Sequence, residues 1–80
     1  MHRLDMSAIR DAAWGEWHRV SSQEAAVAKI KQMWPEIVGQ SDDKVFLMFA
    51  ADPNQDVHVG TVRPAGDGWE YRLKVRVLEK

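Results

Sequence analysis

Three basic side chains alternate near the end of the sequence, where Arg72, Lys74 and Arg76 are separated by single residues. Cations at this spacing along a strand can follow the phosphates of a nucleic acid, and Arg63 extends the row if the end of its own strand twists toward it. The aromatic neighbours of these cations fall on the opposite parity, so this strand cannot present stacking platforms and cations on one face. The row is therefore a candidate nucleic-acid site, weighed against the commoner interpretation of a solvated sheet face.

Catalytic and metal-binding residue types show no comparable pattern. The histidines His2, His18 and His58 are not spaced as metal ligands, and the absence of cysteine excludes disulfides, thiolate zinc sites and a cysteine nucleophile. His58 and Asp56 share one face of a predicted strand, but two ligands on an open face make a weak site. The sequence has no nucleophile elbow, P-loop or dinucleotide-binding motif. We therefore predict a protein that is not an enzyme and has no metal or cofactor.

Length and charge set the class of protein. The 80 residues make one domain, 1–80, which is close to the lower limit for folding without disulfides or metals. The net charge of −1 lacks the basic excess of a typical nucleic-acid-binding domain. The sequence has no apolar run of about 18 residues, which a membrane span requires, and no secretory signal. We expect a cytoplasmic protein that does not contact membranes.

The clearest helix signal begins at Ser21. Glu24 follows three residues later, as in a capping box in which each side chain binds a backbone N–H of the first turn. Apolar residues then recur at helical spacing as far as Trp34, and Pro35 prevents a regular continuation. One further turn, closed by Gly39, is an additional expectation.

The N-terminal third gives a weaker pattern. A helix over roughly residues 7–14 is favoured, with Ser7 as its cap, although Gly15 interrupts the apolar stripe. Residues 15–20 stay open between a continuation of the helix and a short extra strand.

Three strands are predicted after the capped helix, over residues 44–51, 56–63 and 69–80. The two loops between them are short and rich in turn-forming residues, which favours an antiparallel meander. The predicted fold is therefore α+β: an N-terminal helical segment and one well-capped amphipathic helix packed on a three-stranded antiparallel meander. If residues 64–68 form the second loop, Arg63 lies opposite Trp69, and one shared side of the sheet carries the pairs Thr61 with Tyr71, Val59 with Leu73 and Val57 with Val75.

The first of these strands is apolar on both parities, with Val45, Leu47 and Phe49 on one and Phe46 and Met48 on the other. One set must face away from the helix, and leaving it in water forgoes about 1.5 to 3 kcal/mol for each large side chain. Three covers are available: the N-terminal segment, a second copy of the chain, or another protein.

These patterns favour a small non-enzymatic binding or regulatory protein that acts by protein–protein contact, as a homodimer or on a partner. Small accessory proteins of bacteria and their mobile elements have this profile. The predicted interface consists of Val45, Leu47, Phe49, Trp14 and Trp17. The alternative is a weak nucleic-acid-binding module that uses Arg63, Arg72, Lys74 and Arg76.

Overall fold

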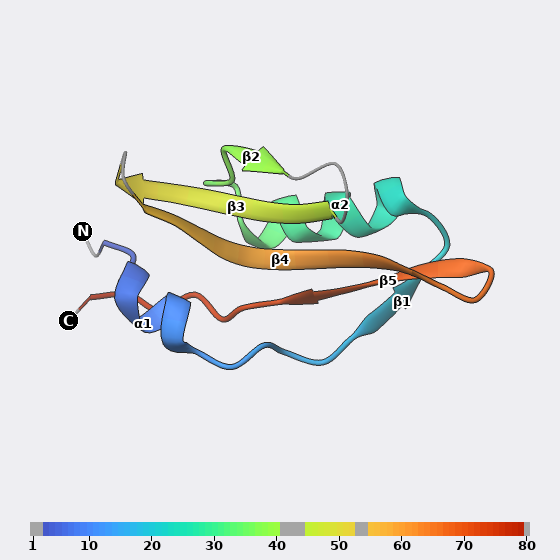
Figure 1. Ribbon diagram of the computed structural model, residues 1–80, viewed down its shortest axis with the longest axis horizontal. Helices are drawn as coiled ribbons and strands as arrows, with labels where there is room; N and C mark the ends of the chain where they lie inside the picture. The colour runs from blue at the N-terminus through green and yellow to red at the C-terminus, as the bar shows by residue number, and fades with distance from the viewer. Residues whose placement is uncertain (1–2, 41–44, 53–54, 80) are drawn as a thin grey trace.

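Five antiparallel strands form a sheet in the order β1-β5-β4-β3-β2, and two helices pack on it (Figure 1). A computed structural model describes residues 3–40, 45–52 and 55–79, with 45–52 and 55–56 described by their backbone only. The predicted α+β class, with a capped helix on a meander of three strands, is confirmed. In chain order the elements are α1 (Met6–Asp11), β1 (His18–Val20), α2 (Gln23–Met33), β2 (Gly39–Gln40), β3 (Val45–Asp52), β4 (Gln55–Ala65) and β5 (Gly68–Leu73).

Helix α2 begins one residue later than the capping-box pattern predicts. The Ser22 side chain, not that of Ser21, accepts a hydrogen bond from the backbone N–H of Ala25 at 3.1 Å. The helix ends at Met33, directly before Trp34 and Pro35, as expected for a proline that cannot donate a hydrogen bond. One further turn does follow, in which the N–H of Ile37 donates to the carbonyl of Trp34 at 3.3 Å, but Gly39 does not close it and instead starts β2.

Helix α1 is shorter than the predicted helix over 7–14. Asp5 caps it, because its carboxylate accepts a hydrogen bond from the N–H of Ala8 at 3.0 Å, and Ser7 lies inside the helix. After α1 the chain runs along β5, and residues 18–20 form β1 at the edge of the sheet. The open question over residues 15–20 is thus resolved in favour of a short strand.

The hairpin between β4 and β5 has a two-residue turn, Gly66 and Asp67. Gly66 has φ +60°, which glycine adopts without steric cost and which suits the first central position of a tight hairpin turn. Arg63 therefore lies opposite Glu70, not opposite Trp69 as predicted. A register shift of one residue exchanges the faces of the sheet, so the predicted pairing of Thr61, Val59 and Val57 is wrong.

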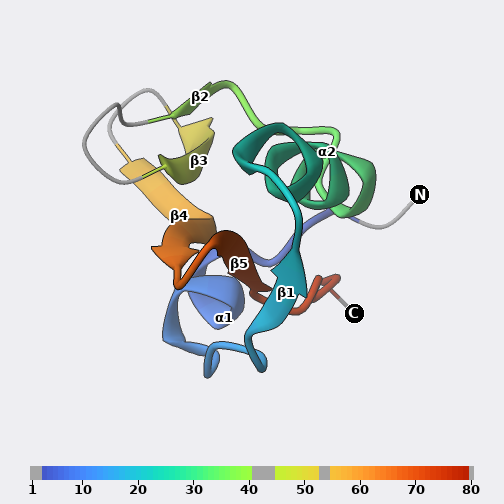
Figure 2. The ribbon, with the colours of Figure 1, turned by 90° about the vertical axis from the view of Figure 1, so that its right-hand side faces the viewer.

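Two clusters of buried residues form the core, and α1 and α2 lie on opposite sides of β5 (Figure 2). Helix α2 contributes Ala26 and Ile30, which pack on Val62 of β4. The second cluster joins Ile9 of α1 to Trp34, Val57 and Val59. The N-terminal segment therefore supplies part of the core. Its predicted role as a cover for the apolar strand over 44–51 lies outside the described residues, because the β3 side chains are not described.

The predicted strand over 69–80 is regular only to Leu73. Beyond it, Lys74 forms an isolated bridge with Trp14, and Leu78 forms one with Leu4. Val75, expected in the buried row, is 60% exposed because the alternation ends with the strand.

Candidate functional site: a ladder of cations and indoles

Cations and indole rings alternate on the face of the sheet that the N-terminal segment crosses. Trp17 contacts two guanidinium groups. The Cζ atom of Arg63 lies 3.7 Å from the centroid of its ring, and the Cζ atom of Arg72 lies 4.8 Å from it. Trp14 contacts the same Arg72 at 4.6 Å and the Lys74 Nζ at 5.1 Å. We call this set, in the order Lys74, Trp14, Arg72, Trp17 and Arg63, the cation–indole ladder.

Strand geometry explains the alternation. Side chains two residues apart on a strand, such as Arg72 and Lys74, are separated by about 7 Å, which is twice the van der Waals contact distance of about 3.5 Å. A ring that crosses this face can therefore contact both cations, as Trp14 does at 4.6 and 5.1 Å. Gly15 allows the approach, because its N–H donates to the carbonyl of Leu73 at 2.8 Å and an added Cβ would lie only 3.0 Å from that oxygen.

Lys74 has a structural role within the ladder. Only 8% of the residue is exposed, and its ammonium group donates to the backbone carbonyl of Arg10 at 2.7 Å. The bond ties the end of α1 to the chain that follows β5. Lys74 is thus not positioned to follow a phosphate backbone.

Arg63 and Arg76 each have a carboxylate partner. Arg63 Nε donates to Glu70 at 2.6 Å, with 51% of the Arg63 side chain exposed. Arg76 lies outside the ladder, against the Trp34 ring at 4.9 Å, and its two terminal nitrogens donate to the two carboxylate oxygens of Glu36, both at 2.6 Å. These hydrogen bonds lower the pKa of Glu36 and raise that of Arg76.

Arg72 differs from the other members of the basic row. No hydrogen bond to its guanidinium occurs within the described residues, and its Nε is buried without a partner. Thr61, directly opposite Arg72 on β4, likewise has a buried hydroxyl without a partner in the described chain. The centre of the ladder is therefore a polar spot with unused hydrogen-bonding capacity.

The two sets of predicted site residues meet at this face. The structure brings Trp14 and Trp17 of the predicted protein interface together with Arg63, Arg72 and Lys74 of the alternative nucleic-acid site. Both indoles are half-buried. The remaining interface candidates belong to β3, and their side chains lie outside the described residues: Val45, Leu47 and Phe49.

The sequence did not predict the contact between the two indole rings and the basic side chains. The aromatic residues of β5 do fall on the opposite parity from the cations, but the stacking rings come from another segment of the chain. The stretch Trp14-Gly15-Glu16-Trp17 carried the only signal, two indoles flanking a small residue, and it needed the strand pairing to be interpreted.

Metal and catalytic candidates gain no support in the described part of the chain. No group of three or more His, Asp or Glu side chains there is arranged to hold a metal ion. The His18 ring lies against Tyr71 at 5.3 Å, and the predicted pair of His58 with Asp56 falls partly outside the described residues, because the Asp56 side chain is not described. A surface hollow on α2 is lined by Ala25, Ala28, Lys29 and Gln32, which include no carboxylate, hydroxyl or imidazole group.

Comparisons with other proteins give no further guide to the ladder. No protein-family model, no curated protein and no solved structure matches the chain. Within the described residues, neither helix has the length and apolar character required to cross a bilayer.

Proposed function

We propose that the chain is a non-enzymatic binding protein that acts by protein–protein contact, as a homodimer or on another protein. The outer side of the cation–indole ladder forms part of its contact surface in this proposal. Tryptophan and arginine are the residue types that most often dominate the binding energy of protein interfaces, and the ladder supplies both. A cytoplasmic regulatory or accessory role, of the kind found in bacteria and their mobile elements, fits a small domain of this type.

The observation that carries the proposal is the contact of Trp17 with two guanidinium groups, whose Cζ atoms lie 3.7 and 4.8 Å from its ring centroid. A half-exposed side chain that is already held in place loses little conformational entropy when a partner binds. The contact surface is therefore preorganised, as in rigid aromatic anchors of matured binding sites.

Exposed apolar side chains add a second argument. Met33, Val38 and Val75 are 49%, 69% and 60% exposed, and each lies within three residues of a member of the Glu36–Arg76 ion pair. Single exposed apolar residues are ordinary, but several near one fixed ion pair are more typical of a contact surface.

The β3 residues remain in the proposal on sequence grounds. Val45, Leu47 and Phe49 belong to a strand that is apolar on both parities. On its edge away from β4, β3 pairs with β2 only through Leu47 and Met48 among the described residues. The rest of this edge has no strand partner in the described part of the chain.

A weak nucleic-acid-binding module is the second candidate, because alternating indoles and guanidinium groups resemble the stacking platforms of single-strand binding proteins. Against it, Lys74 is buried, and Arg63 and Arg76 are paired with carboxylates. If this candidate holds, binding of an oligonucleotide weakens steeply as salt is added.

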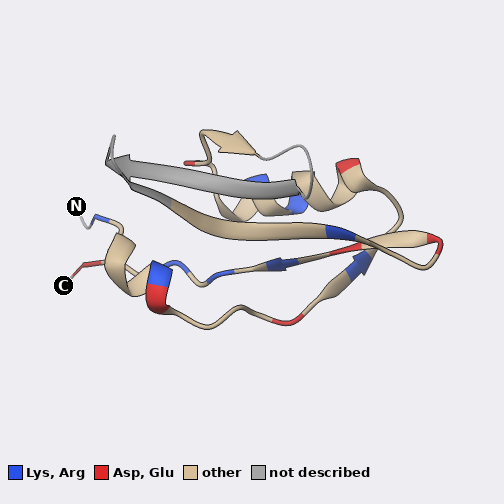
Figure 3. Ribbon diagram, in the orientation of Figure 1, with Lys and Arg blue, Asp and Glu red and all other residues tan. Residues whose placement is uncertain are grey.

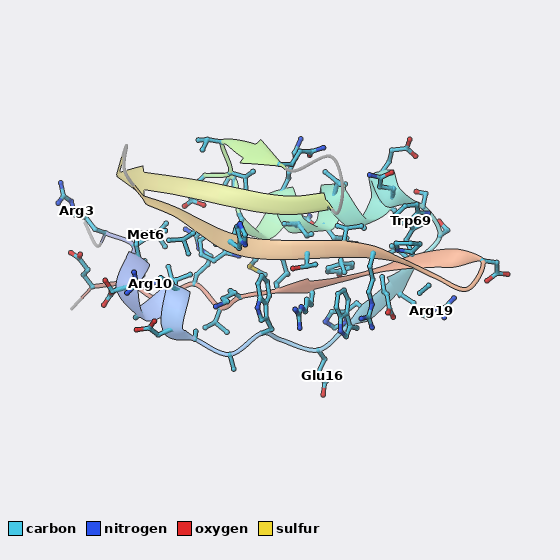
Figure 4. The ribbon with its side chains drawn as sticks, in the orientation of Figure 1. Arg3, Met6, Arg10, Glu16, Arg19 and Trp69 are labelled. Atoms are coloured by element: carbon cyan, nitrogen blue, oxygen red, sulfur yellow. The ribbon has the colours of Figure 1, made fainter. Side chains whose placement is uncertain are left out.

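A photo-crosslinking amino acid tests the proposed surface. Placed at Glu16, which is exposed between the two tryptophans and points away from the sheet, it should crosslink a partner protein or a second copy in living cells (Figure 4). Glu24 on α2 is a matched exposed control and should give no crosslink. Sedimentation at low and high protein concentration then separates the homodimer from partner capture. A monomer at every concentration that also yields no specific crosslink from position 16 refutes the proposal.

A further inference from the structure

The guanidinium group of Arg72 contacts two indole rings and has terminal nitrogens that reach solvent. Trp14 and Trp17 contact it at 4.6 and 4.8 Å, and although Nε is buried, the two terminal nitrogens retain contact with solvent. Stacking leaves all the N–H donors of a guanidinium free, because they point outward in the plane of the group. The two rings thus hold the guanidinium group of Arg72, and no described residue accepts a hydrogen bond from its donors.

The neighbouring cations differ because each has an acceptor within the chain. The carboxylate of Glu70 accepts from Arg63, and that of Glu36 accepts from Arg76. The backbone carbonyl of Arg10 accepts from Lys74. At Arg72, the cross-strand residue Thr61 is only 6% exposed, and its hydroxyl is unpaired within the described residues, so it does not accept a hydrogen bond from Arg72. A partly desolvated cation without an acceptor is costly to the folded state, and a ligand that supplies one lowers that cost.

We propose that Arg72 binds one carboxylate of a protein partner, an Asp or Glu side chain, between the rings of Trp14 and Trp17. The inference rests on the proposed protein-contact function and names the chemistry of its anchor. The two terminal nitrogens of a guanidinium match the two oxygens of a carboxylate, and such bidentate pairs are among the strong hydrogen bonds of proteins.

The surroundings favour a single carboxylate over a chain of phosphates. Acidic residues lie at the end of α1, in the chain between α1 and β1 and at the tip of the β4–β5 hairpin (Figure 3). The exposed acids there are Asp11, Glu16 and Asp67, of which Asp11 pairs with Arg10 and Asp67 with Arg19. Within the described residues, Arg72 is the one cation of the ladder without a carboxylate or carbonyl partner, so the ladder offers one site for an anion and not a row of them. A nucleic acid needs several accessible cations to gain affinity from counterion release.

Hexaglutamate, hexaglutamine and hexathymidylate are suitable probes for an NMR titration of the ¹⁵N-labelled protein. Hexaglutamate should shift the Arg72 Nε–H signal and the indole N–H signals of Trp14 and Trp17, and hexaglutamine should not. Replacing Arg72 by Gln should weaken hexaglutamate binding at least tenfold. Arg19→Gln is the control, because Arg19 is an exposed cation of β1 that pairs with Asp67, away from the two indoles.

Arg72→Lys guards against a folding defect in the first variant, since it keeps the charge. It should also lose most of the affinity, because an ammonium group cannot bind a carboxylate bidentately. Absence of shifts with hexaglutamate, equal shifts with hexaglutamine, or full binding by Arg72→Lys overturns the inference. Tighter binding of hexathymidylate overturns it in favour of nucleic acid. Crosslinking from position 16 without a response to hexaglutamate leaves the protein-contact function standing and removes only the carboxylate anchor.

Discussion

Arg76 binds Glu36 through two parallel hydrogen bonds of 2.6 Å, which join the chain after β5 to the segment after α2. A third bond runs from Arg76 to the carbonyl of Met33 at 3.2 Å. Both partners of the ion pair are about one-third exposed, so solvent screens part of their attraction. The pair fixes the end of α2 against the C-terminal residues without being part of the apolar core.

The ion pair predicts a pH dependence of stability. Because the pKa of Glu36 is lowered in the folded state, its contribution is present above the pKa of the unfolded chain and is lost as pH falls through the folded value. Glu36→Gln should cost about 1 kcal/mol at neutral pH and flatten this acid dependence. Urea unfolding of both proteins from neutral to acidic pH measures the effect, and parallel curves with a constant gap would contradict it.

The approach of β4 to α2 predicts a steric requirement for Gly60. A Cβ at this position would lie 2.6 Å from Cγ2 of Ile30, which is fully buried. Gly60→Ala should destabilise the fold by about 1 to 3 kcal/mol, as other overpacked cores do. A double-mutant cycle with Ile30→Ala should show that the two changes partly offset each other. Strictly additive losses would show that the clash is relieved in some other way.

The cap of α2 distinguishes two adjacent serines. Ser22→Ala should cost about 1 kcal/mol, because the N–H of Ala25 loses its acceptor. Ser21→Ala, a chemically identical change one residue earlier, should remain within about 0.5 kcal/mol of the parent. Thermal or urea unfolding of the two variants decides the matter, and a larger loss for Ser21→Ala restores the capping-box assignment made from sequence.

The hydrogen bond made by the indole of Trp34 should contribute to the free energy of unfolding separately from the packing of its ring. The residue is fully buried, and its indole N–H donates to the carbonyl of Lys74 at 3.1 Å. Trp34→Phe retains an aromatic ring but leaves that carbonyl without its donor, which should cost about 1 to 3 kcal/mol. Trp34→Leu provides a comparison without the ring. Unfolding free energies indistinguishable from the parent would mean that the hydrogen bond contributes nothing.

Local sequence patterns predicted the helices and strands better than they predicted the register in which the strands pair. The period of the apolar residues located α2 and the meander, because each element must bury one side. The register of the hairpin depended on whether the turn used all of residues 64–68 or only Gly66 and Asp67, and turn-forming residues alone do not decide between these lengths.

The candidate site was less accessible to sequence reasoning for a physical reason. Arg72 and the two indoles of Trp14 and Trp17 are more than fifty residues apart, and no periodicity links them. Their contact arises from strand pairing and from the close approach at Gly15. Contacts of this kind follow from tertiary structure, so the sequence alone assigns the indoles and the cations to two different functions.

The pairing of Leu4 with Leu78 places the two ends of the described chain beside each other. Two further hydrogen bonds, from Asp5 N–H to the Val77 carbonyl and from Glu79 N–H to the Arg3 carbonyl, fasten them there. A short linker could therefore join the ends, and the exposed hairpin tip at Gly66 and Asp67 offers a place to open the circle. In such a permutant, β4 and β5 would no longer be consecutive, while the ladder would keep all of its members.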